Sequence, residues 1–322
     1  MIDGLATPEG TDRFRRRFPD LDAAGHFRRV GGLWLSSIGL GTSQGALDAA
    51  ADESYEAAIR LALERGCNVF DTAISYREQR SERALGRALA GAFAAGIAAR
   101  DEVFVVTKGV SVAEQLPQSR ANLGLETVDL YFLHNPESQL AEIARPEFAA
   151  RLTAAFAELE AAAGRGEIGL YGVATWHGLR VPLHDPGHLS LARLVALAGP
   201  RFRAIELPLN LAMPEALVAP TQELGEASVP VLAAARKLDL AVLTSGSIQK
   251  RLGYPVPAEL GEILPGFASD VQRALQFTRS APGVAVALVG MGRPEHVEEN
   301  LAVAAAPLAG IETFQRLFGG PA

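Results

Sequence analysis

The stretch Gly66-Cys-Asn-Val-Phe-Asp-Thr-Ala-Ile-Ser-Tyr76 predicts both the fold of this chain and the place of its site. Residues 67–70 are mostly apolar, with β-branched and aromatic members, which is typical of a short buried strand. Asp71 stands at the carboxyl end of that strand, where parallel barrels and sheets carry their chemistry. Tyr76 follows in the loop. Taken alone, the pair also fits a structural role, with Asp71 capping a turn and Tyr76 packing on the loop.

Two further apolar runs end in side chains that can take part in chemistry. Residues 103–108 end in Lys108, and residues 130–134 end in His134, which Asn135-Pro136 follows. A single lysine or histidine after a strand is usually structural. Three successive strands that deliver Asp71, Lys108 and His134 to one face favour an active site instead.

The strand and helix pattern recurs about eight times, which predicts an α/β fold of the closed (β/α)8 TIM barrel type. The expected strands are 38–42, 68–71, 103–107, 128–133, 168–173, 204–207, 240–244 and 285–289, and the expected helices lie near 52–64, 81–93, 113–123, 147–164, 189–198, 229–238, 269–279 and 294–304. Gly31-Gly32 predicts a hairpin ahead of the barrel. We expect one domain over residues 1–322, with a solvated extension over 1–29, the barrel over about 30–305 and a short carboxyl-terminal tail.

The chain resembles the aldo-keto reductases over roughly residues 30 to 305. The motifs that carry the resemblance are Asp71-Thr-Ala-Ile-Ser-Tyr76, Ser81-Glu82, Leu85-Gly86, Lys108, Leu133-His134-Asn135-Pro136, Gly172-Val173 and Glu298-Glu299-Asn300. That family consists of (β/α)8 barrels that reduce aldehydes and ketones with NADPH. The resemblance implies an oxidoreductase whose catalytic residues are Asp71, Tyr76, Lys108 and His134, with a small-molecule carbonyl compound as substrate.

Chemical reasoning supports these four residue types. Hydride transfer to a carbonyl carbon builds negative charge on the oxygen, so the site needs a proton donor and dipoles. A tyrosine has an ordinary pKa of about 10, and a nearby ammonium lowers it. We therefore expect Lys108 to lower the pKa of Tyr76, Asp71 to pair with Lys108, and His134 to donate a hydrogen bond to the substrate oxygen.

The resemblance also implies contacts for NADPH or NADP+, although NADH is not excluded. The expected cofactor residues are Gly41, Thr42, Asp71, Thr175, Glu206, Ser245, Gly246, Ser247, Gly290, Gly292, Arg293, His296, Glu299 and Asn300, and the expected substrate residues are Trp34, Asn135 and Trp176. Small residues let backbone amides approach a pyrophosphate, and a helix starting at 294 favours phosphate, with Arg293 and His296 as candidates for the 2'-phosphate.

The cofactor side departs from the family pattern at three places. Ala174-Thr175 replaces a common Ser-Asn pair, and Glu206 replaces a common glutamine. Residues 242–247 carry no aromatic side chain to stack on a nicotinamide ring. An ionised Glu206 is expected to accept from the carboxamide amine and to favour the oxidised, positively charged cofactor. These departures keep open a second function, a nucleotide-binding barrel that acts as a regulatory or interaction subunit with little turnover.

Composition and spacing argue against several other classes. A net charge of −7 disfavours nucleic-acid binding, and one cysteine, Cys67, allows no intrachain disulfide. No apolar run reaches the roughly 20 residues of a membrane span, so we expect a cytoplasmic protein. Pro186 and Gly187 separate His184 from His188 and disfavour a metal site. Oligomeric state cannot be read from the sequence.

A Rossmann sheet is the competing fold. Residues 39–45 contain Gly39, Gly41 and Gly45 after an expected strand, but the third glycine is displaced by one position. Asp71 also lies farther on than the roughly 20 residues that separate the ribose-binding acid from this motif. Such a sheet would leave Lys108 and His134 unexplained, so we favour the barrel.

Overall fold

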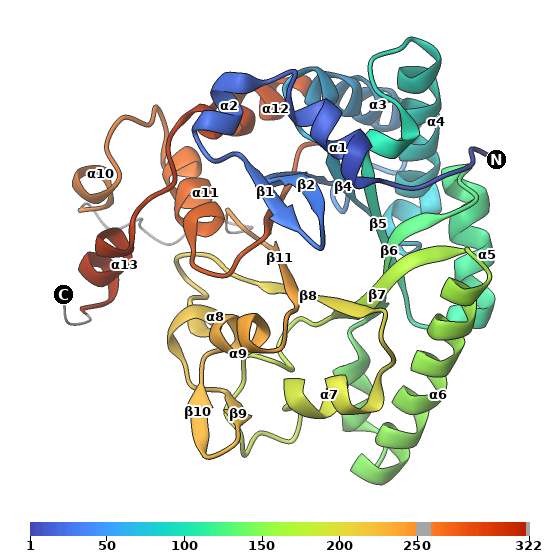
Figure 1. Ribbon diagram of the computed structural model, residues 1–322, viewed down its shortest axis with the longest axis vertical. Coiled ribbons are helices and arrows are strands. Elements are labelled where there is room, and N and C mark those ends of the chain that lie inside the picture. Colours follow the sequence, from blue (N-terminus) through green and yellow to red (C-terminus); the bar gives the residue numbers. More distant parts are fainter. Residues whose placement is uncertain (249–258, 320–322) are drawn as a thin grey trace.

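Eight parallel strands close into a barrel in the computed structural model, which describes residues 1–248 and 259–319 (Figure 1). The strands are β3 (Ile38–Gly41), β4 (Val69–Asp71), β5 (Phe104–Gly109), β6 (Val128–His134), β7 (Ile168–Ala174), β8 (Phe202–Pro208), β11 (Ala241–Ser245) and β12 (Val286–Gly290). They pair in chain order, and β12 returns to β3. The TIM barrel prediction is confirmed, and the Rossmann alternative is wrong because the sheet has no open edge.

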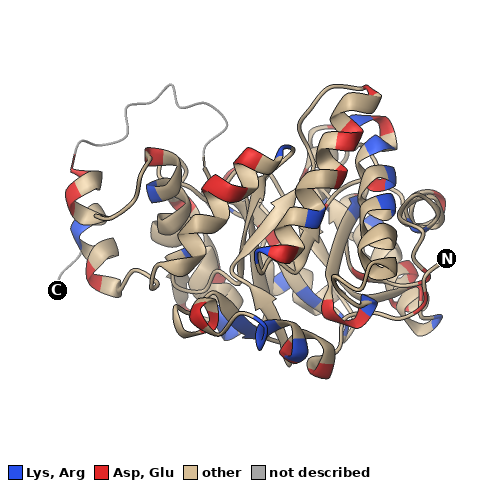
Figure 2. Cartoon of the chain, turned by 90° about the horizontal axis from the view of Figure 1, so that it is seen from above, with Lys and Arg blue, Asp and Glu red and all other residues tan. Residues whose placement is uncertain are grey.

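Helices on the outside of the barrel connect the strands, each within a few residues of its predicted position. They are α3 (Ala49–Glu64), α4 (Arg80–Ala94), α5 (Val112–Leu123), α6 (Arg145–Gly164), α7 (Leu191–Leu197), α9 (Val231–Lys237), α11 (Asp270–Ser280) and α12 (Pro294–Leu301). The α3 helix shows why such segments form. Asp48 caps it by accepting from the amide of Ala51 at 2.8 Å, and Tyr55, Ile59 and Ala62 share its buried face. Charged residues of both signs lie along the outer helices (Figure 2).

The predicted hairpin is confirmed below the amino ends of the strands. It consists of β1 (Phe27–Val30) and β2 (Leu33–Ser36), which pair antiparallel with Val30 opposite Leu33. Gly31 and Gly32 both have positive φ, 56° and 92°, which the two-residue turn requires. Asn68, just before β4, fixes the hairpin by accepting from the amide of Ser36 at 2.8 Å.

Residues 1–29 pack more closely on the barrel than we expect of a solvated extension. They form α1 (Pro8–Arg15) and α2 (Pro19–Ala23), and Phe14 is completely buried. Arg13 and Arg17 form ion pairs with the buried carboxylate of Glu102 at 2.8 and 3.0 Å. The segment is therefore held against the hairpin and barrel by apolar contacts of Phe14 and Phe18 with Phe27 and by ion pairs on its flank.

Inward-facing side chains fill the barrel in layers because residues alternate in direction along each strand. On β5 the inward positions are Phe104, Val106 and Lys108. The lower layers are apolar, and their members are Val69, Phe104, Val106, Leu130, Phe132, Ala204, Leu243, Val286 and Leu288. Among the described side chains that point into the barrel, the ionisable ones gather in the layer at the carboxyl end.

Several elements were not predicted from the sequence. Between β8 and α9 the chain forms α8 (Glu215–Val218) and a small hairpin of β9 (Gln222–Leu224) and β10 (Ala227–Val229). After β11 it forms α10 (Leu260–Ile263), and α13 (Ile311–Phe318) follows the barrel. In the described part of the chain, no helix combines the length and apolarity needed to cross a membrane.

Candidate active site

Four strands bring ionisable side chains together at the carboxyl end of the barrel. The Lys108 ammonium, completely buried on β5, donates to a carboxylate oxygen of Asp71 from β4. It also donates to Oε2 of Glu206 from β8 at 2.8 Å. The expected pair of Asp71 with Lys108 is therefore present, but Lys108 has a second carboxylate partner. Glu206 was expected to face the cofactor carboxamide, and one of its oxygens instead binds Lys108.

Tyr76 and His134 complete the cluster on its open side. The centroid of the Tyr76 ring lies 5.5 Å from Nζ of Lys108 and 6.2 Å from the centroid of the His134 ring. Both side chains are partly exposed, whereas Lys108 is not. The phenol and the imidazole can therefore meet an incoming molecule while the ammonium acts from behind them.

An unusual turn fixes the position of Tyr76. The next three residues, Arg77, Glu78 and Gln79, all have left-handed φ, at 49°, 54° and 67°. Such a run is costly for residues with a side chain and needs support from its surroundings. The buried Arg77 supplies it by donating to the carbonyl of Ala46 at 2.6 Å and to Asp52 at 2.7 Å. Sequence reasoning missed Arg77, because nothing in the residue types signals a left-handed run.

Burial and mutual charge set the protonation of the cluster. Burial alone would lower the pKa of Lys108, but the charges of Asp71 and Glu206 raise it above its ordinary value. Burial raises the pKa of Asp71, although the Lys108 ammonium opposes this shift. Lys108 is therefore charged at neutral pH.

The two open-side groups are both neutral near pH 7. Burial raises the pKa of Tyr76 well above its ordinary value, and the opposing charge of Lys108 does not overcome it. The expectation of a net lowered pKa for Tyr76 is therefore wrong in this state, because desolvation of the phenolate outweighs the ammonium. Burial, with the charge of Lys108, lowers the pKa of His134 to about 4. The site thus presents a protonated phenol and a neutral imidazole.

A cavity of about 240 Å³ adjoins the cluster and gathers many of the residues expected to bind a cofactor. Those of them that line it are Gly41, Asp71, Glu206, Ser245, Gly246, Ser247 and Gly290, and the expected catalytic residue Tyr76 lines it as well. Ser43 and Gln44, in the loop after β3, also line it and were not predicted. Gly246 has a positive φ of 60°, and its carbonyl accepts from the side chain of Asn210 at 2.9 Å, which shapes this loop.

Thr175 and Thr42, both expected to bind the cofactor, lie beside this cavity. Their hydroxyl groups differ in whether they already have a hydrogen-bond partner among the described residues. Thr175 is buried, and its hydroxyl has no hydrogen-bond partner in the described part of the chain. Its amide donates to the carbonyl of Glu206 at 2.8 Å, so the hydroxyl is held at the end of β7. Thr42, in contrast, already donates to the carbonyl of Asp71 through its hydroxyl at 3.1 Å.

The remaining expected cofactor residues lie at the start and along α12. Arg293 is exposed at the amino end of the helix, and its guanidinium lies 2.7 Å from Nε2 of His296. Glu299 accepts from the hydroxyl of Ser269 at 2.8 Å, and the buried Asn300 has an Oδ1 without a partner among the described residues. Gly292 packs so closely on the ring of Tyr55 that a Cβ there would lie 2.9 Å from it.

The expected substrate residues do not all lie at this end of the barrel. Asn135 follows β6 directly, with a left-handed φ of 48°, and Trp176 follows β7 with 44% of its surface exposed. Trp34 lies on β2, at the opposite end, where the guanidinium of Arg15 stacks 4.1 Å from its ring centroid. The expectation for Trp34 is wrong because the hairpin that carries it covers the amino ends of the strands.

Glu137 organises the loop that carries Trp176, and sequence reasoning missed it. Its Oε1 accepts from three successive amides, those of Trp176 at 2.8 Å, His177 at 3.2 Å and Gly178 at 3.3 Å. The side chain is nearly fully buried. A carboxylate that accepts several amides holds a loop in one shape. The Asn-Pro that precedes Glu137 gave no sign of this role. His188, weighed above as a metal ligand, instead lies 2.8 Å from the carbonyl of Thr221.

Comparison with known sequences identifies similar proteins over part of the chain. The model of the aldo/keto reductase family matches residues 37–181. An aldo-keto reductase of Mycobacterium avium (strain 104) is 39% identical over 112 residues, which are 33% of this chain and 35% of that protein. The NADPH-dependent codeinone reductase 1-4 of Papaver somniferum is 36% identical over 115 residues, 33% of this chain and 34% of that protein. These matches span about a third of the length of each relative.

Comparison with solved structures extends the likeness to nearly the whole fold. An aldo/keto reductase from Klebsiella pneumoniae, in complex with NADP and acetate, gives a TM-score of 0.69 at 20% identity, covering 92% of this chain and 96% of that one. An aldo-keto reductase from Bombyx mori, in complex with NADP, gives a TM-score of 0.65 at 21% identity, covering 90% and 91%. At this identity the likeness supports the barrel architecture.

Proposed function

We propose that the chain is a member of the aldo-keto reductase family, whose model matches residues 37–181, and that it is an NADPH-dependent oxidoreductase that reduces an aldehyde or ketone to an alcohol. The observation that carries this proposal is the convergence of Tyr76, His134 and Lys108 at one opening. The ring centroid of Tyr76 lies 5.5 Å from Nζ of Lys108 and 6.2 Å from the ring centroid of His134. One small substrate oxygen is therefore within reach of both the phenol and the imidazole. Asp71 and Glu206 both form ion pairs with the ammonium of Lys108.

The side chains around the cavity fit a nicotinamide nucleotide. When bound, such a cofactor supplies the hydride. We assign the unpartnered hydroxyl of Thr175 to the carboxamide and the amides around Ser245 and Ser247 to the pyrophosphate. We assign Arg293 and His296, at the start of α12, to a 2'-phosphate. The ratio of kcat/KM for NADPH to that for NADH, measured before and after Arg293→Ala, tests the last assignment.

In the proposed reaction the four residues have separate tasks. Neutral His134 donates a hydrogen bond that orients the carbonyl oxygen, and the protonated hydroxyl of Tyr76 gives its proton to that oxygen as charge develops there. The Lys108 ammonium stabilises the phenolate that remains. Asp71 keeps Lys108 charged and directed at Tyr76. The raised pKa of Tyr76 keeps the phenol protonated at neutral pH.

Glu206 gives this site an excess of negative charge. Two carboxylates contact one ammonium, so the buried group carries a net charge of about −1 when all three are ionised. A positively charged nicotinamide is favoured beside such a group more than the neutral reduced form is. We propose that Glu206 raises the affinity for the oxidised cofactor through this charge, while one of its oxygens stays on Lys108.

Turnover of 4-nitrobenzaldehyde with NADPH tests the enzymatic proposal. We expect Tyr76→Phe to lower kcat by about 10²- to 10⁴-fold, since a general acid contributes that much. NADPH affinity, measured by quenching of protein fluorescence, should stay within about twofold. Tyr131→Phe is the control, because it removes the same hydroxyl from a buried tyrosine whose Oη has no partner among the described residues. Cofactor binding by the wild-type protein, without turnover of any carbonyl compound tried, would favour the regulatory barrel.

A further inference from the structure

A second and larger cavity, of about 600 Å³, lies at the amino end of the barrel, away from the cluster described above. It is enclosed between the β1–β2 hairpin and the first residues of the barrel strands. Its apolar wall consists of Leu33, Leu35, Phe104, Leu130 and Leu243. A volume of this size is within the range of small-molecule sites.

The cavity is separate from the proposed active site. Phe104, which lines it, and Lys108 of the catalytic cluster both point inward from β5 and are four residues apart. At a strand rise of about 3.3 Å per residue, they are separated by roughly 13 Å. Val106 fills the barrel between them. A ligand in the lower cavity therefore does not touch the reacting groups.

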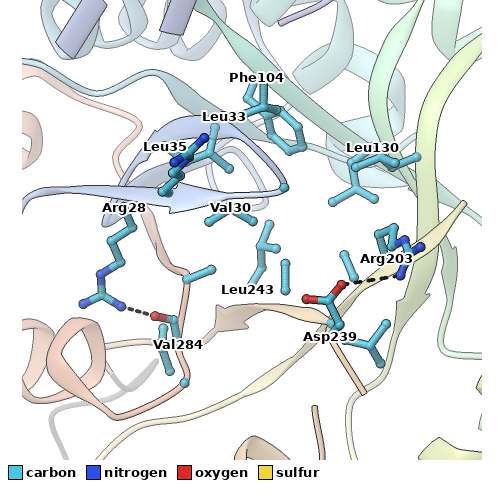
Figure 3. A pocket seen from close by; sticks show the side chains of 18 of the residues that line it. Arg28, Val30, Leu33, Leu35, Phe104, Leu130, Arg203, Asp239, Leu243 and Val284 are labelled. Carbon is cyan, nitrogen blue, oxygen red and sulfur yellow. Dashed lines mark hydrogen bonds and ion pairs between the residues drawn. The ribbon is translucent and has the colours of Figure 1, made fainter. Parts of the chain in front are cut away.

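Basic side chains surround this apolar wall. Arg28 and Arg29 come from the hairpin, Arg203 from β8 and Arg236 from α9. The only carboxylate among the residues lining it is Asp239, which is 97% exposed and lies 3.7 Å from Arg203. Figure 3 shows Arg28 and Arg203 on opposite sides of the hollow, with Val30 and Leu243 between them. The lining is positively charged in a chain whose net charge is −7.

Arg28 is the most informative of these residues, because it is a partly buried cation that no carboxylate in the described part of the chain contacts. Its guanidinium donates to the carbonyls of Val284 and Arg279 and forms no ion pair with any residue that the structure describes. Its Nε is buried without a partner in the same part of the chain. Arg279, whose carbonyl it binds, is itself a fully buried arginine, and among the described residues its guanidinium donates only to carbonyls. Buried charges are usually paired, so an anion nearby would complete this arrangement.

We propose that this cavity binds an amphipathic organic carboxylate, with its hydrocarbon part against the leucine and phenylalanine wall and its head group among the arginines. Apolar contact area supplies the attraction for the chain, and the arginines supply the preference for an anion. The assignment concerns a site distinct from the proposed reaction and holds whether or not the protein reduces carbonyls.

Three probes of related chemistry test the assignment by isothermal titration calorimetry. Decanoate has both parts of the expected ligand, decyltrimethylammonium has the same chain with the opposite charge, and acetate has the head group alone. We expect saturable one-site binding of decanoate only. Equal affinity for decyltrimethylammonium would overturn the proposal by removing the role of the arginines. Equal affinity for acetate would overturn it by removing the role of the apolar wall.

Paired charge reversals locate the site. We expect Arg203→Glu/Arg236→Glu to weaken decanoate binding by at least about tenfold, because both residues are exposed at the rim and their reversal repels the carboxylate. Arg60→Glu/Arg151→Glu is the control, since these arginines are 60% and 54% exposed elsewhere and their reversal changes the net charge equally. Unchanged binding in the rim variant, or equal weakening in both, would overturn the proposal.

A plug and a competition assay separate this site from the active site. Val30→Trp fills the cavity from the hairpin and should abolish decanoate binding while leaving carbonyl turnover unchanged. If this variant does not fold, the rim variant still decides the question. Competition between decanoate and 4-nitrobenzaldehyde in steady-state kinetics would place decanoate at the catalytic end and overturn the proposal.

Discussion

Two clusters of charged side chains, one at each end of this barrel, are stabilised in different ways. At the carboxyl end, the Lys108 ammonium lies between the carboxylates of Asp71 and Glu206. At the amino end, Arg28 and Arg279 donate to backbone carbonyls and have no carboxylate partner in the described chain. In the first cluster, burial would lower the pKa of Lys108, but the charges of Asp71 and Glu206 raise it, so the ammonium stays charged as the proposed proton transfer requires. In the second, the guanidinium groups bind backbone carbonyls, and their positive charge is not neutralised by a carboxylate of the described chain.

The largest effect is expected when the cation of the carboxyl end is removed. Lys108→Met should lower kcat for carbonyl reduction by about 10³-fold, because the phenolate of Tyr76 loses its ammonium. It should also destabilise the fold by about 3 kcal/mol or more, since two buried carboxylates lose their partner. Initial rates and urea unfolding measure both effects. The control is Lys237→Met at an exposed position; comparable losses there would contradict the assignment.

Acid should destabilise both ends through one histidine at each. Burial lowers the pKa of His26, near the hairpin, to about 3, and that of His134 to about 4, from an ordinary value near 6.5. Each group therefore contributes stability above pH 6.5 that is lost as the pH falls toward its folded pKa. We expect the free energy of unfolding to fall by at least about 2 kcal/mol between pH 7 and pH 4.

Replacement of His26 tests its share of that loss. His26→Gln should reduce the slope of stability against pH below 6.5, as measured by urea unfolding at several pH values. His184→Gln, at an exposed position, should leave the slope unchanged. A slope that is the same in all three proteins would show that His26 titrates alike in the folded and unfolded states.

A smaller effect is expected from neutralising one carboxylate of the catalytic cluster. Glu206→Gln keeps the shape of the side chain but removes the excess negative charge beside Lys108. We expect the affinity for NADP+ to fall by about tenfold, or about 1.4 kcal/mol, with little change for NADPH. Titrations with both cofactor forms measure this difference, with the exposed Glu223→Gln as control. Equal changes for the two forms would contradict the charge argument.

The smallest effect is expected from the loop after β7. Glu137→Gln weakens the acceptor that holds the amides of Trp176 and His177. The KM for an aromatic aldehyde should rise by about threefold, with kcat nearly unchanged, because the loop lies beside the reacting groups and not among them. Glu142→Gln, on the surface, is the matched control. A fall in kcat instead would mean that Glu137 acts on the cluster itself.

The sequence was sufficient for the barrel because its signals are local and repeated. Eight apolar runs, each followed by a helical pattern, imply a closed parallel sheet, and the last residue of each run then falls at one common end. Asp71, Lys108 and His134 were placed together by that rule alone. The hairpin followed from Gly31-Gly32, because two adjacent glycines suit its turn.

What the sequence could not supply depends on contacts between distant segments. The ion pair of Glu206 with Lys108 joins residues 98 positions apart, and the balance of burial against charge at Tyr76 requires coordinates. Arg77 and Glu137 act through backbone groups, which leave no trace in residue type. Trp34 was assigned to the wrong end because its hairpin was recognised but not its distance from the chemistry. The cavity at the amino end of the barrel depends on how the folded elements pack, which residue types alone do not predict.

The left-handed run after Tyr76 has a consequence for anyone who wishes to change what this protein accepts. Arg77, Glu78 and Gln79 form a rigid turn beside the phenol of Tyr76. The side chain of Arg77 holds this turn by donating to the carbonyl of Ala46, in another loop, and to Asp52 on α3. Variants with random residues at positions 77–79 would lose activity before their substrate preference changed. Diversity is better directed at Trp176, which follows β7 and has 44% of its surface exposed.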